Sequence, residues 1–196
     1  YTSTAKEAHE VQEQLFQIAQ RTRASMGATT ELWQRLSQAN KQLKLDQGAL
    51  QGVLETLNKT LVISGTSAES AKAGLIQLGQ AFASGELRGE ELRSVMEQMP
   101  RLTMALAEGL DTNVAGLRKM AEAGELTADR VIKAVQSQQA IIDTEFSGMS
   151  VTVEQAGTAM DNAMGRMIDR LNKATGASEL LAQAIMNVAT SISQVS

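Results

Sequence analysis

The segment that decides the fold of this chain is Gly85-Glu86-Leu87-Arg88-Gly89-Glu90-Glu91-Leu92-Arg93-Ser94-Val95-Met96-Glu97-Gln98-Met99-Pro100. An alanine-rich helical pattern runs into Gly, then into Glu-Leu, and then into a new amphipathic helix. The same order returns at Gly124-Glu125-Leu126-Thr127-Ala128-Asp129-Arg130-Val131. Gly accepts the positive φ that often follows a helix end, and the Leu can turn back onto the core. Both segments are therefore predicted to be corners between helices, with Thr127 as a good N-cap and Arg88 as a poor one.

Two further breaks follow the first corner. Pro100 lacks a backbone N–H and disfavours α geometry at Met99, so one helix is predicted to end there and the next to begin. Gly109 and Asp111 mark another corner before residue 113. The residues that we predict to shape these corners are Gly85, Leu87, Pro100, Gly109, Asp111, Gly124, Leu126 and Thr127.

The composition predicts an all-α fold. The 196 residues are 43% hydrophobic and 20% charged, which is typical of a globular chain with a sizeable core. One proline is present, aromatic residues make up 3%, and alternating β-branched runs are nearly absent. We interpret the ten methionines as core residues between helices rather than as a ligand groove. The expected architecture is a bundle of short helices with Gly and Pro corners.

We predict two units, a helical domain over residues 1–148 and an αα-hairpin over residues 149–196 that need not pack on it. The first helix is predicted from residue 3 to residue 26, with Gly27 ending it and the next helix starting near Thr29 or Thr30. Asp46 is the predicted N-cap of a third helix. The apolar pattern lapses from about Asp143 to Ser150, which predicts a linker.

The hairpin is predicted from two stripes of apolar residues at helical spacing. The first stripe consists of Val153, Met160, Met164, Met167 and Leu171. After Gly176, Ser178 is the predicted cap of a final helix with the stripe Leu181, Ile185, Val188, Ile192 and Val195. These helices are expected to pack against each other or another copy of the chain. Insertion into a membrane as amphipathic elements is the less favoured alternative.

Charge and cysteine content restrict the classes of function. The net charge is −4 with no basic run, so we predict no nucleic-acid contact through this fragment. The absence of cysteine excludes a disulfide framework and a thiolate site. The sequence contains no run of about eighteen apolar residues, so no conventional transmembrane helix is predicted. The sequence starts at Tyr1 without a signal-peptide pattern, and we interpret it as a fragment of a longer protein.

No residue pattern predicts catalysis, a cofactor site or a metal site. His9 is the single histidine, and zinc sites need three or four His, Cys or acidic ligands. Glu90 and Glu91 are adjacent, so on a helix their side chains point about 100° apart, and in a first turn they favour the helix dipole. Gly85 and Gly89 follow no strand and precede no phosphate-binding lysine. We therefore predict that the chain is not an enzyme.

A family resemblance rests on the corner sequence and its continuation. The residues that carry it are Gln77-Leu78-Gly79-Gln80-Ala81-Phe82-Ala83-Ser84-Gly85-Glu86-Leu87-Arg88-Gly89-Glu90-Glu91-Leu92, then Ser94-Val95-Met96-Glu97-Gln98-Met99-Pro100-Arg101-Leu102, Ala105-Leu106-Ala107-Glu108-Gly109-Leu110, and Leu117-Arg118-Lys119-Met120-Ala121-Glu122-Ala123-Gly124-Glu125-Leu126-Thr127. This order resembles the tape measure domain of tailed-phage tail tape measure proteins, most strongly over residues 61–136. Asp111 stands where the family tends to have Gly. Because Asp also adopts the left-handed conformation, the corner is expected to persist.

The resemblance implies a structural protein of phage or prophage origin. Such proteins act as rulers that are enclosed by the tail tube and set tail length through helix–helix contacts. The implied partners are the tail tube protein, tail assembly chaperones and baseplate or tail-tip proteins, with self-association as a further expectation. The implied location is the virion tail, after assembly in the host cytoplasm. The alternative, from another class, is a helical adaptor that binds a partner helix.

One expectation conflicts with a simple ruler. A single helix rises about 1.5 Å per residue, so 196 residues would span roughly 290 Å. The Gly and Pro corners instead predict short helices. We therefore expect either a folded head on the ruler or a metastable fold that opens inside the tube.

Overall fold

The computed structural model describes residues 2–66, 68–175, 183 and 186, and this part of the chain is all-helical. Its helices are α1 (Thr2–Arg21), α2 (Met26–Leu43), α3 (Gln47–Ile63), α4 (Ala68–Ser84), α5 (Gly89–Gln98), α6 (Pro100–Gly109), α7 (Val114–Glu122), α8 (Ala128–Ser137), α9 (Gln139–Ser147) and α10 (Val153–Thr175). The prediction of an all-α bundle of short helices is confirmed. The second helix predicted for the hairpin, over residues 178–196, falls largely outside the described residues.

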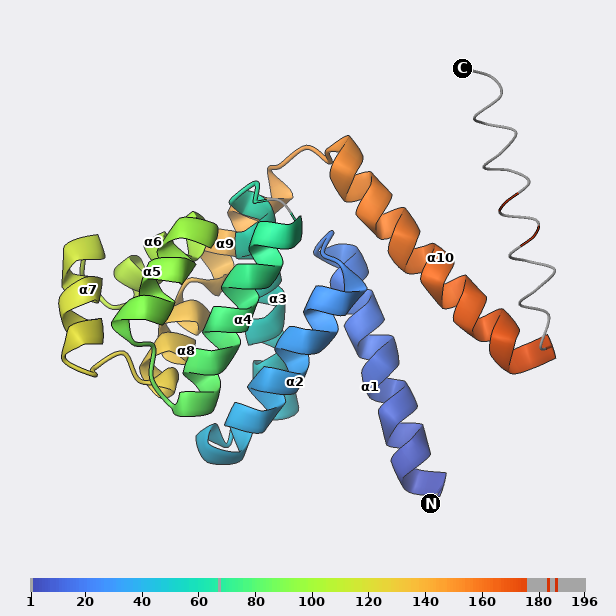
Figure 1. Ribbon diagram of the computed structural model, residues 1–196, viewed down its shortest axis with the longest axis horizontal. Helices are drawn as coiled ribbons and strands as arrows, with labels where there is room; N and C mark the ends of the chain where they lie inside the picture. Colours follow the sequence, from blue (N-terminus) through green and yellow to red (C-terminus); the bar gives the residue numbers. More distant parts are fainter. Residues whose placement is uncertain (1, 67, 176–182, 184–185, 187–196) are drawn as a thin grey trace.

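Helix α3 is the centre of the bundle. It contacts α2, α6, α8 and α9, while α4 packs on both α2 and α5. Leu54, Leu57, Leu102, Leu106 and Val135 have no exposed side-chain surface. Figure 1 shows these helices gathered into one body, with α7 on its outer edge and α10 extending away from it. The core therefore joins elements from α1, which contributes Leu15 and Ile18, to α8.

The first helix is shorter than predicted. It ends at Arg21, and α2 already begins at Met26, so Gly27 lies in the first turn of α2 rather than at a helix end. Arg23 takes the left-handed conformation with φ +58°, and the Ser25 side chain accepts a hydrogen bond from the Ala28 N–H. The prediction was wrong because a non-glycine residue makes this turn, and Ser25 was the available N-cap signal.

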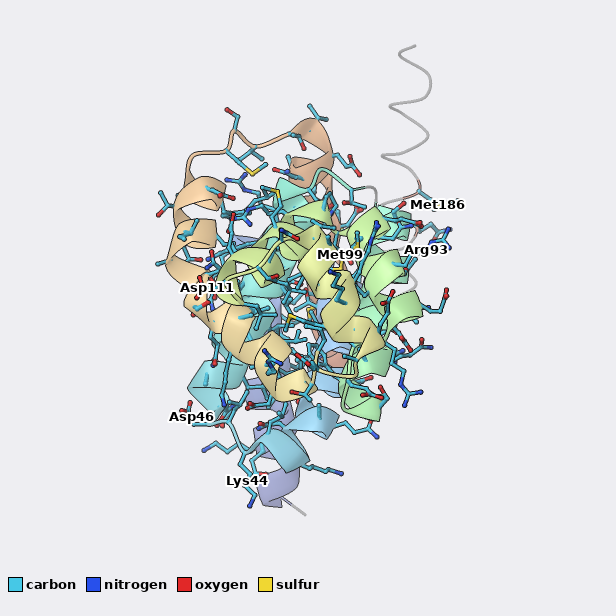
Figure 2. The ribbon with its side chains drawn as sticks, turned by 90° about the vertical axis from the view of Figure 1, so that its left-hand side faces the viewer. Lys44, Asp46, Arg93, Met99, Asp111 and Met186 are labelled. Carbon is cyan, nitrogen blue, oxygen red and sulfur yellow. The ribbon has the colours of Figure 1, made fainter. Side chains whose placement is uncertain are left out.

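The turn between α2 and α3 follows the sequence expectation. Asp46 caps α3 by accepting from the Ala49 N–H at 2.8 Å. Lys44 ends α2 with φ +54°. Figure 2 shows Lys44 and Asp46 close together at one end of the molecule.

The segment predicted as a linker is in part a helix. Helix α9 continues to Ser147, and Ile142 and Phe146 on it are buried. Helix α9 has too few apolar residues to form a stripe that the sequence pattern would reveal. Those it has are enough to pack on one side of α3. The irregular connection to α10 is limited to residues 148–152.

Candidate functional site

The two Gly-Glu-Leu corners meet in space, although about forty residues separate them in the sequence. The Leu87 N–H donates to the Leu126 carbonyl at 2.7 Å, and the Ala128 N–H donates to the Gly85 carbonyl at 2.8 Å. Glu86 and Thr127 form an antiparallel bridge between the corners. This pairing joins the end of α4 to the start of α8 and brackets α5, α6 and α7 between them.

The glycines and leucines of this paired corner have separate tasks. Gly85 and Gly124 have φ values of +90° and +69°, which favour glycine over residues with a side chain. Leu87 and Leu126 are buried, at 1% and 0% exposure. The glycines thus turn the chain, and the leucines fasten each turn to the core.

The two helices that leave the corners start differently. The Thr127 hydroxyl accepts from the Arg130 N–H at 3.4 Å and caps α8. Arg88 precedes α5 without a side-chain capping bond, and its guanidinium instead donates to Glu86 at 2.6 Å. Helix α5 therefore depends on packing rather than on a cap, with Leu92 and Val95 buried on its inner face.

The break at Pro100 is supported by side chains from another turn. Met99 has φ −134° and ψ 62°, and Pro100 occupies the first turn of α6. The Thr66 hydroxyl donates to the Gln98 carbonyl at 2.8 Å, and the Arg101 N–H donates to the Ser64 hydroxyl at 3.1 Å. These bonds satisfy backbone groups that the break leaves free. Met99, labelled in Figure 2, is fully buried.

The corner after α6 uses two residues for two purposes. Asp111 takes the left-handed conformation, with φ +50°. Gly109 ends α6 without a positive φ, but a Cβ there would lie 2.6 Å from the Ala134 carbonyl oxygen. Gly109 thus permits close approach of α6 and α8. Sequence reasoning missed this role, because the neighbour lies on another helix.

A half-buried ion network holds α9 against the bundle. The Arg101 side chain, 8% exposed, donates to both carboxylate oxygens of Glu145 at 2.6 and 2.9 Å. On the other side of α9, Lys59 pairs with Asp143 at 2.7 Å and with Glu55 at 2.8 Å. Arg21 at the end of α1 also pairs with Glu55, so the network consists of charges from α1, α3, α6 and α9, and no single segment of the sequence predicted it.

The pKa values in this network shift toward the charged forms. The bidentate hydrogen bond from Arg101 lowers the pKa of Glu145. Burial alone would raise the pKa of Glu55 and lower that of Lys59. Hydrogen bonds from Lys59 and Arg21 outweigh burial at Glu55 and lower its pKa, while Asp143 and Glu55 raise the pKa of Lys59. The partners therefore stabilise each other as ions.

Helix α10 contacts the bundle through polar groups. The Asn162 side chain accepts from the Met26 N–H at 2.9 Å and donates to the Ala24 carbonyl at 2.8 Å. Arg166 pairs with Glu13 and lies over the Phe16 ring, 4.0 Å from its centroid. We call the two hydrogen bonds of Asn162 the Asn162 clasp. The division into units 1–148 and 149–196 stays a prediction, but α10 does touch the first unit.

Between α1 and α10 lies a groove of about 360 Å³. Phe16 and Met26 form part of its apolar lining, and Asp161, Arg166 and Arg170 form part of its polar lining. His9 borders the groove and is exposed. Among the described residues, no three His, Cys, Asp or Glu side chains gather as a metal site, and no helix has the length and apolarity to span a bilayer.

Comparison with known families gives one match. A family model described as "Tape measure protein" matches residues 1–173, which is most of the chain. No curated protein and no solved structure matches the sequence. The match includes the paired corner and α10 up to residue 173, and it confirms the resemblance inferred from the corner sequence. It also favours this family over a generic helical adaptor.

Proposed function

Because this chain belongs to the tape measure protein family, it is a structural component of a phage tail, and we propose that it forms a folded head on the ruler that sets tail length. The observation that carries the proposal is the paired corner. Main-chain hydrogen bonds join Gly85 to Ala128 and Leu87 to Leu126, so the chain between them is folded back instead of extended. A segment folded in this way adds little to the length of a ruler.

The proposed mode of action is contact between helices, without catalysis. The tail tube protein would enclose the ruler, and tail assembly chaperones and baseplate or tail-tip proteins would contact it during assembly in the host cytoplasm. The corner residues Gly85, Leu87, Gly124 and Leu126 would act by maintaining the fold of the head. A cell-wall zymogram with this chain should show no clearing, and clearing would contradict the non-catalytic part of the proposal.

An in-frame deletion tests whether this region measures length. As one continuous helix, residues 67–142 would contribute roughly 110 Å to the ruler. If the region is a folded head, phage that carry the deletion should assemble tails that are shortened by far less than this. Electron micrographs of the tails give the measurement. Shortening by the full helical increment would contradict the proposal.

A point variant separates loss of folding from loss of length. Leu126→Asp keeps the number of residues but places a charge in a fully buried position, which costs several kcal/mol. We expect fewer complete particles and an unchanged length in those that assemble. If the variant assembles as well as the wild type, the head fold is not needed for assembly.

A further inference from the structure

The side chain of Asn58 on α3 is fully buried and is hydrogen-bonded at one end only. Its Nδ2 donates to the Thr22 hydroxyl at 3.3 Å and to the Thr29 hydroxyl at 3.0 Å. These hydroxyls donate in turn to the carbonyl of Ile18 at 2.7 Å and to that of Ser25 at 2.9 Å. Because their hydrogens are used there, neither hydroxyl donates to the Asn58 Oδ1. This oxygen has no hydrogen-bond partner among the described residues.

Asn58 lines a cavity of about 270 Å³, which we call the Asn58 cavity. The cavity lies between the end of α3, the turn from α1 to α2, and the start of α10. An acceptor that is buried without a donor lowers the stability of a fold, so a donor that enters this cavity is favoured. The volume far exceeds the about 10–15 Å³ that one water molecule requires. The cavity therefore admits a small solute or a short side chain.

Arg23 lines the same cavity and is a donor with long hydrogen bonds. Its two terminal nitrogens both donate to the Met149 carbonyl at 3.4 Å, and Nη1 also donates to the Gln155 Oε1 at 3.3 Å. Most N–H···O bonds in proteins measure about 2.7–3.2 Å, so a closer acceptor would bind this guanidinium better. Its Cζ lies 4.6 Å from the centroid of the Phe146 ring, which holds the group in place. The cavity thus offers one unpaired acceptor and one weakly paired donor.

The charges around the Asn58 cavity favour a neutral ligand. Its charged lining residues are Arg23 and Glu154, one of each sign. A buried cation needs a carboxylate beside it, whereas Glu154 is exposed. A carboxylate ligand has no hydrogen to donate to the Asn58 Oδ1. Leu61 and Val62 provide an apolar wall against which a short hydrocarbon stem can pack.

We propose that the Asn58 cavity binds a carboxamide group, which donates an N–H to the Asn58 Oδ1 and accepts a hydrogen bond from Arg23. A carboxamide is neutral and has both a donor and an acceptor, so it matches the two groups that the cavity leaves free. The same chemistry occurs in small amides and in the glutamine and asparagine side chains of a protein partner. This site is separate from the paired corner, so its test is independent of the proposed folded head.

NMR titration of the ¹⁵N-labelled full chain with propionamide tests the proposal. Two compounds of similar size are the controls: propionate has acceptors but no donor, and propylammonium has donors but no acceptor. We expect propionamide to cause saturable shifts of the Asn58 side-chain amide and of the Val62 backbone amide. It should bind about tenfold or more tightly than either control. Equal or tighter binding of a control, or no saturable shift with propionamide, would overturn the proposal.

A variant that fills the cavity tests where the ligand binds. Val62→Phe enlarges a half-buried lining residue and leaves Asn58 and Arg23 in place. The matched control is Ile63→Phe, because Ile63 is the next residue of α3, is also half-buried and does not line the cavity. We expect Val62→Phe to weaken propionamide binding about tenfold or more, and Ile63→Phe to leave it unchanged. Equal binding by Val62→Phe and the wild type would overturn the assignment to this cavity.

A pair of blocked tripeptides identifies the source of the carboxamide. One has a central glutamine and the other a central glutamate, so they differ only in the group that the cavity is proposed to recognise. If the glutamine peptide binds at least as tightly as propionamide, a protein side chain fits the cavity. If only propionamide binds, the ligand is a small solute. Equal binding of the two peptides would overturn recognition of the carboxamide.

Discussion

At the scale of single residues, the glycines of this chain serve two different physical needs. Gly85 and Gly124 are required by their positive φ, whereas Gly109 is required by the backbone of α8 beside it. A Cβ at Gly109 would lie 2.6 Å from the Ala134 carbonyl oxygen and 2.9 Å from its Cα. Backbone atoms cannot move aside like the end of a long side chain, so α6 and α8 would have to separate.

Replacement of Gly109 by Ala is therefore expected to destabilise the fold despite the higher helix propensity of Ala. Overpacking of this kind costs about 1–3 kcal/mol of unfolding free energy. The control is Gly27→Ala, because nothing lies within 4 Å of a Cβ there, and it should be neutral or stabilising by up to about 1 kcal/mol. Urea unfolding with comparison of midpoints gives the measurement. A Gly109→Ala protein as stable as wild type would show that the two helices can separate freely.

At the scale of elements, local signals in the sequence predicted the corners that depend on Gly, Pro or a capping side chain. Gly85, Pro100, Gly124 and Thr127 act on their own neighbours, so the sequence pattern is sufficient to locate their helix ends. The turn at Arg23 was missed because an arginine with φ +58° carries no local signal of its own, and the N-cap signal of Ser25 two residues later was not recognised.

The contacts between elements could not be predicted in the same way. The repeated Gly-Glu-Leu motif was visible in the sequence, but the hydrogen bonds that join its two copies depend on the packing of α4 to α8. The charge network on α9 has the same origin, since Arg101 and Glu145 lie on different helices. Periodicity reports which face of a helix is buried, and not which partner it meets.

The attachment of α10 gives a prediction at this scale. Asn162→Ala removes both hydrogen bonds of the Asn162 clasp and leaves the Met26 N–H and the Ala24 carbonyl unpaired, which costs about 1–3 kcal/mol. Hydrogen exchange of α10 and of the Arg23–Met26 turn is expected to rise about tenfold or more. Exchange in α3, α6 and α8 should stay unchanged, because the clasp touches none of them. The control Asp161→Ala alters the neighbouring exposed residue and should leave all rates near wild type. Unchanged exchange in Asn162→Ala would mean that other contacts hold α10.

At the scale of the whole molecule, two kinds of interaction stabilise different parts of the fold. The apolar core around α3 holds the bundle together, and the ion network fastens α9 over it. A core of leucines gives stability that is largely independent of pH. The network adds a contribution that depends on both carboxylates and amines being charged, so the pH profile of unfolding reports on it separately.

The sign of that profile follows from the shifted pKa values. Glu145 and Glu55 have pKa values below the ordinary 4.5, so their contribution is complete above that pH and is lost as pH falls through the lowered values. Lys59 has a pKa above 10.5, so its contribution is complete below that pH and is lost as pH rises through the raised value. We expect the free energy of unfolding to be nearly flat between about pH 6 and 9 and to fall on both sides. Urea unfolding measured below, within and above this pH range gives the free energy of unfolding as a function of pH.

A single variant tests whether the ion network causes the loss of stability at low pH. Glu145→Gln removes one carboxylate that titrates differently in the folded and unfolded states, so the fall in stability below pH 4.5 should become shallower. At neutral pH the same variant should be less stable, because Arg101, whose side chain is 8% exposed, loses its bidentate partner and keeps only the longer pairing with Glu108 at 3.5 Å. The control Glu154→Gln alters an exposed carboxylate at the start of α10, outside the network. If the free energy of unfolding falls equally steeply at low pH in Glu145→Gln and in the wild type, other carboxylates cause the acid sensitivity of the fold.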